Sequence, residues 1–104
     1  MVAELQRDLP MDKIVDFCKR WKIREFAVFG SILSEDFRPD SDVDVLVTFD
    51  DDIEWGFEYA QMQDELAEIL DRSVDLGTKR GVSHSRNVRR REEILSTART
   101  IYAA

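Results

Sequence analysis

The chain has 104 residues, a length that favours one domain over residues 1–104 and leaves no room for a separate substrate-binding domain. Hydrophobic residues make up 43% and charged residues 36%, which is typical of a folded globular protein and excludes a disordered one. No apolar run approaches the ~20 residues of a membrane-spanning helix, the single Cys18 excludes an internal disulfide, and the first ten residues lack the layout of a secretory signal. We therefore expect a cytoplasmic protein that makes no contact with a membrane.

The net charge of −7 is distributed unevenly along the chain. Residues 1–78 contain 20 acidic and 8 basic residues, a balance of −12, whereas residues 79–104 contain 7 basic and 2 acidic residues, a balance of +5. Affinity for the nucleic-acid backbone requires a positive face, so the acidic first part argues against direct nucleic-acid binding. The basic last part is suited to a local anionic ligand or to an acidic partner.

The first third of the chain predicts a helix, a strand and a tight turn. Pro10 is well placed to start a helix over residues 11–21, where apolar residues recur every three or four positions. Residues 23–29 (IREFAVF) are rich in aromatic and branched side chains and predict a strand that ends at Gly30. A short helix is expected at residues 31–33. The first helix is expected to bury Ile14, Phe17, Cys18 and Trp21.

A second strand is predicted over residues 43–49, after a loop over 35–41 that contains Pro39. Side chains alternate between the two faces of a strand. One face is expected to carry Val43, Val45, Val47 and Phe49, and the other Asp42, Asp44, Leu46 and Thr48. An acidic turn is expected at residues 50–52.

The second half predicts two helices and one short strand. A helix is expected over residues 54–71, with Phe57, Met62, Leu66, Ile69 and Leu70 as core contacts. A strand over 73–76 is closed by Gly77, and after a polar loop a last helix is expected over 87–102. That helix is expected to turn inward Val88, Leu95, Ala98, Ile101 and Tyr102. The order of elements predicts an α+β (α/β) domain, a small mixed β-sheet covered by helices.

Asp42 and Asp44 stand two positions apart on a strand, so both side chains project from the same face. Aspartate is depleted in strands, and a buried carboxylate without a partner is costly. Two rigidly spaced oxygen donors suit a divalent cation, and Mg²⁺ is favoured because it binds one or two protein carboxylates together with phosphates and waters. On its own, this pair is a weak signal and is more often part of an exposed strand or an acidic turn.

Gly30 and Ser31 directly follow the first strand. A glycine lets another group approach the backbone closely, and the following turn can direct N–H groups and the Ser31 hydroxyl at an anion. A glycine-serine turn also occurs as simple punctuation between elements. The combination is more specific, because a strand, Gly-Ser, ten further residues and Asp-x-Asp place a phosphate site beside a metal site.

Asp75 lies on the predicted third strand, between Val74 and Leu76. If that strand neighbours the strand of Asp42 and Asp44, three carboxylates lie at one end of the sheet. Three carboxylates that bind two metal ions about 3.5–4 Å apart are a usual arrangement for in-line phosphoryl chemistry. The alternative for Asp75 is an exposed aspartate at the end of a strand.

The run GSILSEDFRPDSDVDVLV, followed downstream by VDL, resembles the minimal nucleotidyltransferase family of the polymerase-beta-like superfamily. The likeness covers nearly the whole chain, and EEILSTARTIY near its end resembles the C-terminal helix of the family. The resemblance implies a polymerase-beta-like nucleotidyltransferase fold. It also implies transfer of a nucleoside monophosphate, usually AMP from ATP, to a hydroxyl group with release of pyrophosphate.

The resemblance also implies roles for individual residues. Gly30 and Ser31 would hold the phosphates of the nucleotide, Asp42 and Asp44 would bind two Mg²⁺ ions, and Asp75 would complete one metal site and help to deprotonate the attacking hydroxyl. Family members of this size are often antitoxins that add AMP to a tyrosine of a HEPN-domain RNase toxin. A similar role and partner are implied here, and the sequence is compatible with either a homo- or a hetero-oligomer.

One part of the motif departs from the family. Members commonly read Gly-Ser-x-Ala-Arg-Gly, whereas here Ser34 stands at the arginine position and Glu35 follows it. This change removes a positive charge that would help to neutralise a triphosphate. Arg38 matches the family and is expected to contribute charge at the nucleotide site.

Other features leave alternatives open. The basic cluster of Arg86, Arg89, Arg90 and Arg91 is most simply a solvated helix face, and contact with a triphosphate or an acidic partner is the alternative. The competing function is a non-catalytic antitoxin that blocks its partner by occlusion. Transfer to a small molecule is disfavoured, because members with such substrates usually carry an added domain.

Overall fold

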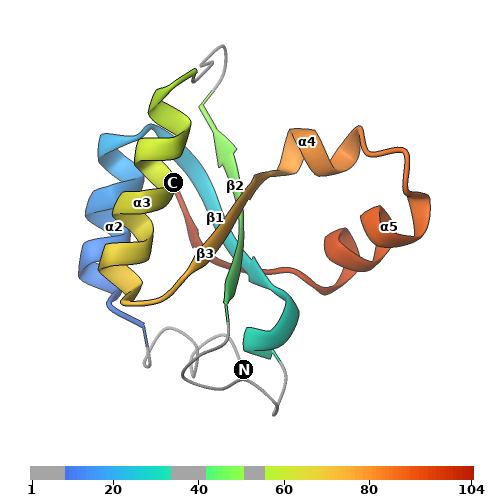
Figure 1. The fold of residues 1–104 in the computed structure, drawn as a ribbon, viewed down its shortest axis with the longest axis horizontal. Helices are drawn as coiled ribbons and strands as arrows, with labels where there is room; N and C mark the ends of the chain where they lie inside the picture. The colour runs from blue at the N-terminus through green and yellow to red at the C-terminus, as the bar shows by residue number, and fades with distance from the viewer. Residues whose placement is uncertain (1–8, 34–41, 51–55) are drawn as a thin grey trace.

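The computed structural model describes residues 9–33, 42–50 and 56–104 (Figure 1). Four strands form one sheet in the order β3-β2-β1-β4: β1 Ile23–Phe29, β2 Val43–Phe49, β3 Val74–Thr78 and β4 Arg99–Ala103. β1 pairs antiparallel with both β2 and β4, whereas β2 pairs parallel with β3. The sheet is therefore mixed, as predicted, and the bounds of β1 and β2 agree with the sequence patterns.

Two helices, α2 Met11–Arg20 and α3 Glu58–Leu70, cover one face of the sheet (Figure 1). The apolar residues of α2 are spaced by three and one, so Ile14, Phe17 and Cys18 all face the sheet and are buried. α3 contributes Met62 and Leu66, which are fully buried as predicted. Full burial of a side chain of this size stabilises the fold by roughly 1.5–3 kcal/mol. The larger of the two apolar clusters among the described residues lies in this layer. From the strands, this core includes Ile23, Phe26, Val28, Val43, Val45, Val47, Val74, Leu76 and Ile101.

The opposite face is covered by α4 Lys79–Ser83 and α5 Val88–Thr97 (Figure 1). Its apolar cluster is small, with Ala27, Leu46 and Ile94 buried. Both helices start at a side-chain cap: the Thr78 hydroxyl accepts a hydrogen bond from the Gly81 N–H at 2.9 Å, and the Asn87 Oδ1 accepts one from the Arg90 N–H at 3.1 Å. α4 occupies part of the predicted polar loop, which corrects that expectation.

The predicted last helix over residues 87–102 is wrong in its second half. α5 ends at Thr97, Ala98 has an extended ψ of 140°, and the chain continues as β4. The branched Ile101 fits a strand beside β1, where it is buried in the main core. Val88 and Leu95, expected to point inward, are 50% and 39% exposed. The apolar cluster on this face is small, so α5 buries only Ile94 and leaves Val88 and Leu95 exposed.

Two further bounds differ from expectation. α3 starts at Glu58, so the expected core residue Phe57 precedes the helix and is 99% exposed. Gly77 lies inside β3, because pairing with β2 extends that strand to Thr78. The loop predicted over 35–41 and the acidic residues 51 and 52 lie outside the described residues. Among the helices that the structure describes, the longest is α3 with 13 residues, and none combines the length and apolar character needed to cross a membrane.

Candidate functional site

The end of β1 and the starts of β2 and β3 lie at the same end of the sheet, which is called the acidic edge below. This follows from the pairing, since β2 runs parallel to β3 and antiparallel to β1. Asp44 is paired with Phe29 on one side and with Asp75 on the other. Asp42 directly precedes β2, and Gly30 begins the 3₁₀ helix η1 (Gly30–Leu33) that follows β1 at this edge (Figure 1). The strand of Asp75 therefore neighbours the strand of Asp44, which is the condition that the sequence left open.

The carboxylates lie on the face that α4 and α5 cover. Asp44 is two residues before Leu46, which packs with Ile94 of α5, and alternation along a strand places both on the same face. Asp75 follows because it stands opposite Asp44 in the parallel register. The main core, with α2 and α3, is on the other side of the sheet. The chemistry-bearing residues are therefore separated from the bulk of the core.

Gly30 leaves space that the Asp44 carboxylate occupies. Its φ of +78° lies in the left-handed region, which side chains other than glycine rarely adopt. A Cβ placed on Gly30 would lie 2.2 Å from Oδ2 of Asp44 and 3.2 Å from its Cγ. Glycine is therefore required here for two reasons, backbone conformation and close approach. Sequence reasoning predicted the close approach but assigned it to a phosphate, and the neighbour present is Asp44. Ser31 follows within η1.

The described charges that act on Asp44 are of both signs. Burial raises the pKa of Asp44 above its ordinary value, and the negative charges of Asp75 and Asp42 raise it further, whereas the positive charge of Arg90 lowers it. Asp42 and Asp75 are exposed and Asp44 is half-buried. Neighbouring carboxylates that disfavour one another's ionised form create a local preference for cations.

The donor set fits a magnesium ion. Within the described residues, no three His, Cys, Asp or Glu side chains are already gathered closely enough to hold a metal ion. Mg²⁺ does not require such a closed cage, because it usually binds one or two carboxylates and completes its shell with waters and substrate phosphates. The half-buried Asp44 and the exposed Asp42 and Asp75 provide hard oxygen donors with room for such ligands. Arg38 and Ser34, which the sequence motif singled out, lie outside the described residues.

α3 fixes the strand that carries Asp75. The Tyr59 hydroxyl donates a hydrogen bond to the Leu76 carbonyl at 2.6 Å, and the Gln63 Oε1 accepts one from the Leu76 N–H at 3.2 Å. These bonds satisfy the backbone of Leu76 on the outer side of β3, an edge strand of the sheet. Burial and the nearby charge of Asp75 raise the pKa of Tyr59. Sequence reasoning did not assign this role, although the spacing of four between Tyr59 and Gln63 signals a shared helix face.

A pocket of about 250 Å³ lies between the end of β3, α4 and α5. Its lining comprises Gly77, Thr78, Gly81, Val82, Ser85, Arg90, Arg91 and Ile94. Of the four predicted basic residues, Arg90 and Arg91 line this pocket, whereas Arg86 and Arg89 are exposed and do not. Arg91 donates a hydrogen bond from Nη1 to the Ser85 carbonyl at 3.2 Å, which ties α5 to the preceding loop.

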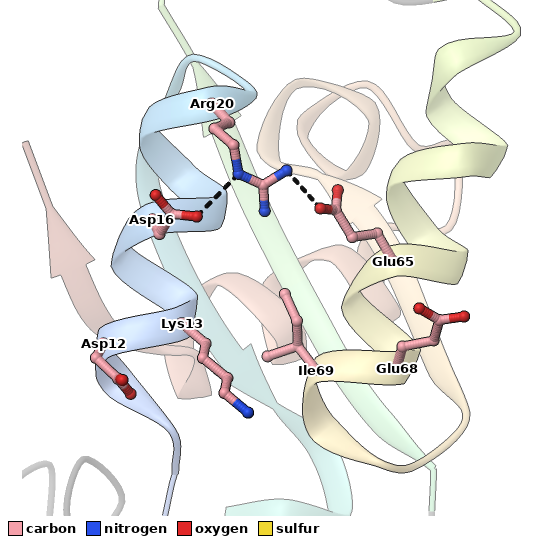
Figure 2. Close-up of a pocket in the computed structure, with 7 residues that line it drawn as sticks. All are labelled: Asp12, Lys13, Asp16, Arg20, Glu65, Glu68 and Ile69. Carbon is pink, nitrogen blue, oxygen red and sulfur yellow. Dashed lines mark hydrogen bonds and ion pairs between the residues drawn. The ribbon is translucent and has the colours of Figure 1, made fainter.

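A larger pocket of about 480 Å³ lies between α2 and α3, on the other side of the sheet (Figure 2). Arg20 crosses it, with ion pairs to Asp16 at 2.9 Å and Glu65 at 2.5 Å. Glu65 also accepts a hydrogen bond from Nε1 of Trp21 at 2.5 Å. Figure 2 shows the Arg20 guanidinium between the carboxylates of Asp16 and Glu65. The ion pair between Arg20 and Glu65 therefore joins the two helices. This groove is on the opposite face of the sheet from Asp44.

Comparison with known proteins assigns the family. The family model described as "Nucleotidyltransferase domain" matches residues 11–98. The chain therefore belongs to the nucleotidyltransferase domain family. The Methanocaldococcus jannaschii protein named "Putative protein adenylyltransferase MJ1379" is 34% identical over 64 residues, which are 61% of this chain. The match spans 64% of the length of that relative.

Solved structures share the fold. A structure of a "toxin-antitoxin with AMP-PNP" superposes with a TM-score of 0.70 at 21% identity, covering 92% of this chain and 75% of that one. A "tri-AMPylated Shewanella oneidensis HEPN toxin in complex with MNT antitoxin" gives a TM-score of 0.62 at 21% identity, with coverages of 89% and 69%. A "putative minimal nucleotidyltransferase" gives 0.67 at 26% identity, with 94% and 93%. The fold is thus the polymerase-beta-like nucleotidyltransferase fold that the sequence motif predicts.

Proposed function

We propose that this protein is a magnesium-dependent nucleotidyltransferase that transfers AMP from ATP to a hydroxyl group of a partner protein. Membership of the nucleotidyltransferase domain family supports the reaction type. The relative named as a protein adenylyltransferase supports a protein acceptor, and the fold shared with a toxin–antitoxin structure holding AMP-PNP supports ATP as the donor. The observation that carries the proposal is the pairing of Asp44 with Asp75 beside Gly30, on the face opposite the main core.

In this proposal, the carboxylates of Asp42 and Asp44 bind the metal ions, and Gly30 and Ser31 face the phosphates of ATP. Bound magnesium neutralises phosphate charge and makes the α-phosphorus more open to attack. Asp75 contributes to the metal site and accepts the proton of the acceptor hydroxyl. A bond forms between the acceptor oxygen and the α-phosphorus, the bond from the α-phosphorus to the bridging oxygen of the β-phosphate breaks, and pyrophosphate leaves.

The acceptor in this proposal is a tyrosine of a HEPN-domain toxin, so that AMP transfer makes the protein an antitoxin. The AMPylated HEPN toxin in one structure of similar fold supports that choice of partner. The exposure of Asp42 and Asp75 also supports it, because a site at the protein surface can receive a side chain that projects from another folded protein.

The test uses α-labelled ATP, Mg²⁺ and a HEPN-domain toxin as the candidate acceptor. We expect covalent label on the partner, and a loss of at least about 100-fold in labelling with Asp42→Ala or Asp44→Ala. Asp50→Ala is the matched control, because Asp50 is an exposed aspartate at the other end of β2 and should leave labelling unchanged.

Two outcomes would contradict this proposal. If the Asp44→Ala variant labels the partner as fully as the wild-type protein does, the carboxylate of Asp44 is not needed for AMP transfer. Neutralisation of the toxin without any label, unaffected by both aspartate substitutions, would instead show an antitoxin that works by binding and occlusion. Thermal unfolding of each variant separates these results from a loss of the fold.

A further inference from the structure

The basic last part of the chain forms a wall beside the face of the sheet that carries the carboxylates, with α4 next to the end of β3 and away from its start. Residues 79–104 carry a balance of +5 and include α4 and α5, which lie on the carboxylate face (Figure 1). The pocket of about 250 Å³ separates these helices from the end of β3. Its floor includes Gly77, which shares a face with Asp75 because the two are two positions apart on β3. The pocket is therefore on the same face of β3 as Asp75.

Arg90 is a cation of this wall that lines the pocket and is available to a ligand. Its backbone N–H is used by the Asn87 cap, but its guanidinium makes no hydrogen bond to any described residue. Arg91, its neighbour, already donates to the Ser85 carbonyl. Arg90 lines the pocket from the α5 side, across from Gly77 and Thr78 of β3. An exposed guanidinium with free donors next to a ligand site is suited to phosphate oxygens.

The charge balance gives that guanidinium a function. ATP would bring further negative charge to the acidic edge, which already carries Asp42, Asp44 and Asp75. Metal ions would offset part of the repulsion between the phosphates and the carboxylates. A fixed positive charge on α5 would offset more of it without occupying the carboxylates. Arg89 is one position away on α5 but lines no part of the pocket, so it should not act on the same ligand.

We propose that Arg90 is a positioning residue that binds a phosphate group of the nucleotide from the α5 side of the site. This inference rests on the proposed function, because it takes ATP as the ligand. The guanidinium contributes hydrogen bonds and charge to the phosphate chain and leaves the transfer chemistry to the carboxylates.

The test is the dissociation constant of Mg-ATP, measured by calorimetry on the whole chain without any acceptor. We expect Arg90→Ala to weaken binding about 10- to 100-fold, the range for loss of one charge-assisted hydrogen bond or pair. Arg90→Lys should recover part of the loss, because it keeps the charge without the guanidinium fork. Arg89→Ala, which removes the same charge from an adjacent exposed position, should change binding less than about 3-fold. Binding of adenosine, which lacks phosphates, should be equal in all four proteins.

The outcomes separate the two proposals. If the wild-type protein binds Mg-ATP but the dissociation constants of Arg90→Ala and Arg89→Ala agree within 2-fold, the role of Arg90 is overturned. The proposed function would still stand in that case. Wild-type protein that does not bind Mg-ATP would overturn both. An equal loss in Arg89→Ala and Arg90→Ala would show a diffuse effect of net charge, and that result also overturns the assignment to Arg90. The exposed Arg90 side chain makes no hydrogen bond or ion pair within the described part of the chain, so the variants should unfold at the wild-type temperature.

Discussion

Replacement of Gly30 by alanine should damage the site more than it damages the fold. The substitution adds one methyl group at a residue with φ +78°, directly against the Asp44 carboxylate. The backbone conformation costs alanine roughly 1–2 kcal/mol relative to glycine. For a domain of this size, that cost lowers the unfolding temperature by about 5–15 °C.

The steric effect falls on Asp44. The added Cβ would stand 2.2 Å from Oδ2, and ordinary contact begins near 3.4 Å, so the two atoms must move apart by about 1.2 Å. The carboxylate is the end of a side chain and is the group most able to move. A displacement of ~1 Å in a catalytic constellation can cost on the order of 100-fold in rate. We therefore expect AMP transfer to fall about 100-fold while most of the protein remains folded at 20 °C.

The assay pairs thermal unfolding with transfer of labelled AMP. Gly56→Ala is the control, because Gly56 is exposed and its added Cβ would lie 3.7 Å from the nearest atom, Oε2 of Glu58. It should retain both stability and activity. If Gly30→Ala transfers AMP at the wild-type rate, the close approach of Gly30 and Asp44 does not govern the site. If the unfolding temperature of Gly30→Ala is also unchanged, residue 30 does not require the left-handed conformation.

Three further predictions concern the fold. Phe26→Ala should reduce the free energy of unfolding by about 3–5 kcal/mol, whereas Phe57→Ala, at a 99% exposed position, should change it by less than about 0.5 kcal/mol; denaturant titration compares the two. Asn87→Ala should cost about 1 kcal/mol through loss of the α5 cap, and equal midpoints for variant and wild type would contradict that role. Burial raises the pKa of Cys18 to about 12 from 9.0, so between pH 9 and 12 the unfolded chain releases a proton that the folded chain keeps. Stability should therefore fall with rising pH by up to about 1.4 kcal/mol per unit, and Cys18→Ala should lack this component.

The sequence was most informative where local pattern and final structure agree. The period of α2 and the apolar runs of β1 and β2 predicted these elements with little error at their ends, because each buries a continuous face. β4 was missed because nothing between α5 and Arg99 resembles a breaker: Ala98 is a good helix former, and the strand conformation depends on pairing with β1. Tertiary pairing decided that segment.

The candidate site shows the same division. The adjacency of the Asp44 and Asp75 strands could be predicted, because both open short apolar strands at the same relative position. The contact between Gly30 and Asp44 could not, since it depends on the register of β1 against β2. The difference between Arg89 and Arg90 depends on the rotation of α5 about its axis, which a helix with a single buried residue, Ile94, barely encodes.

The late position of β4 in the chain has a consequence for biosynthesis. β1 is complete at Phe29, but its second neighbour is the strand Arg99–Ala103, about 70 residues further along. A nascent chain emerges from its N-terminal side, so β1 displays unpaired backbone groups until the ribosome has released β4. During that interval, the exposed edge is open to pairing with another chain. Folding of the sheet is therefore expected to finish only after release of residue 103, and a chain interrupted within α5 should aggregate.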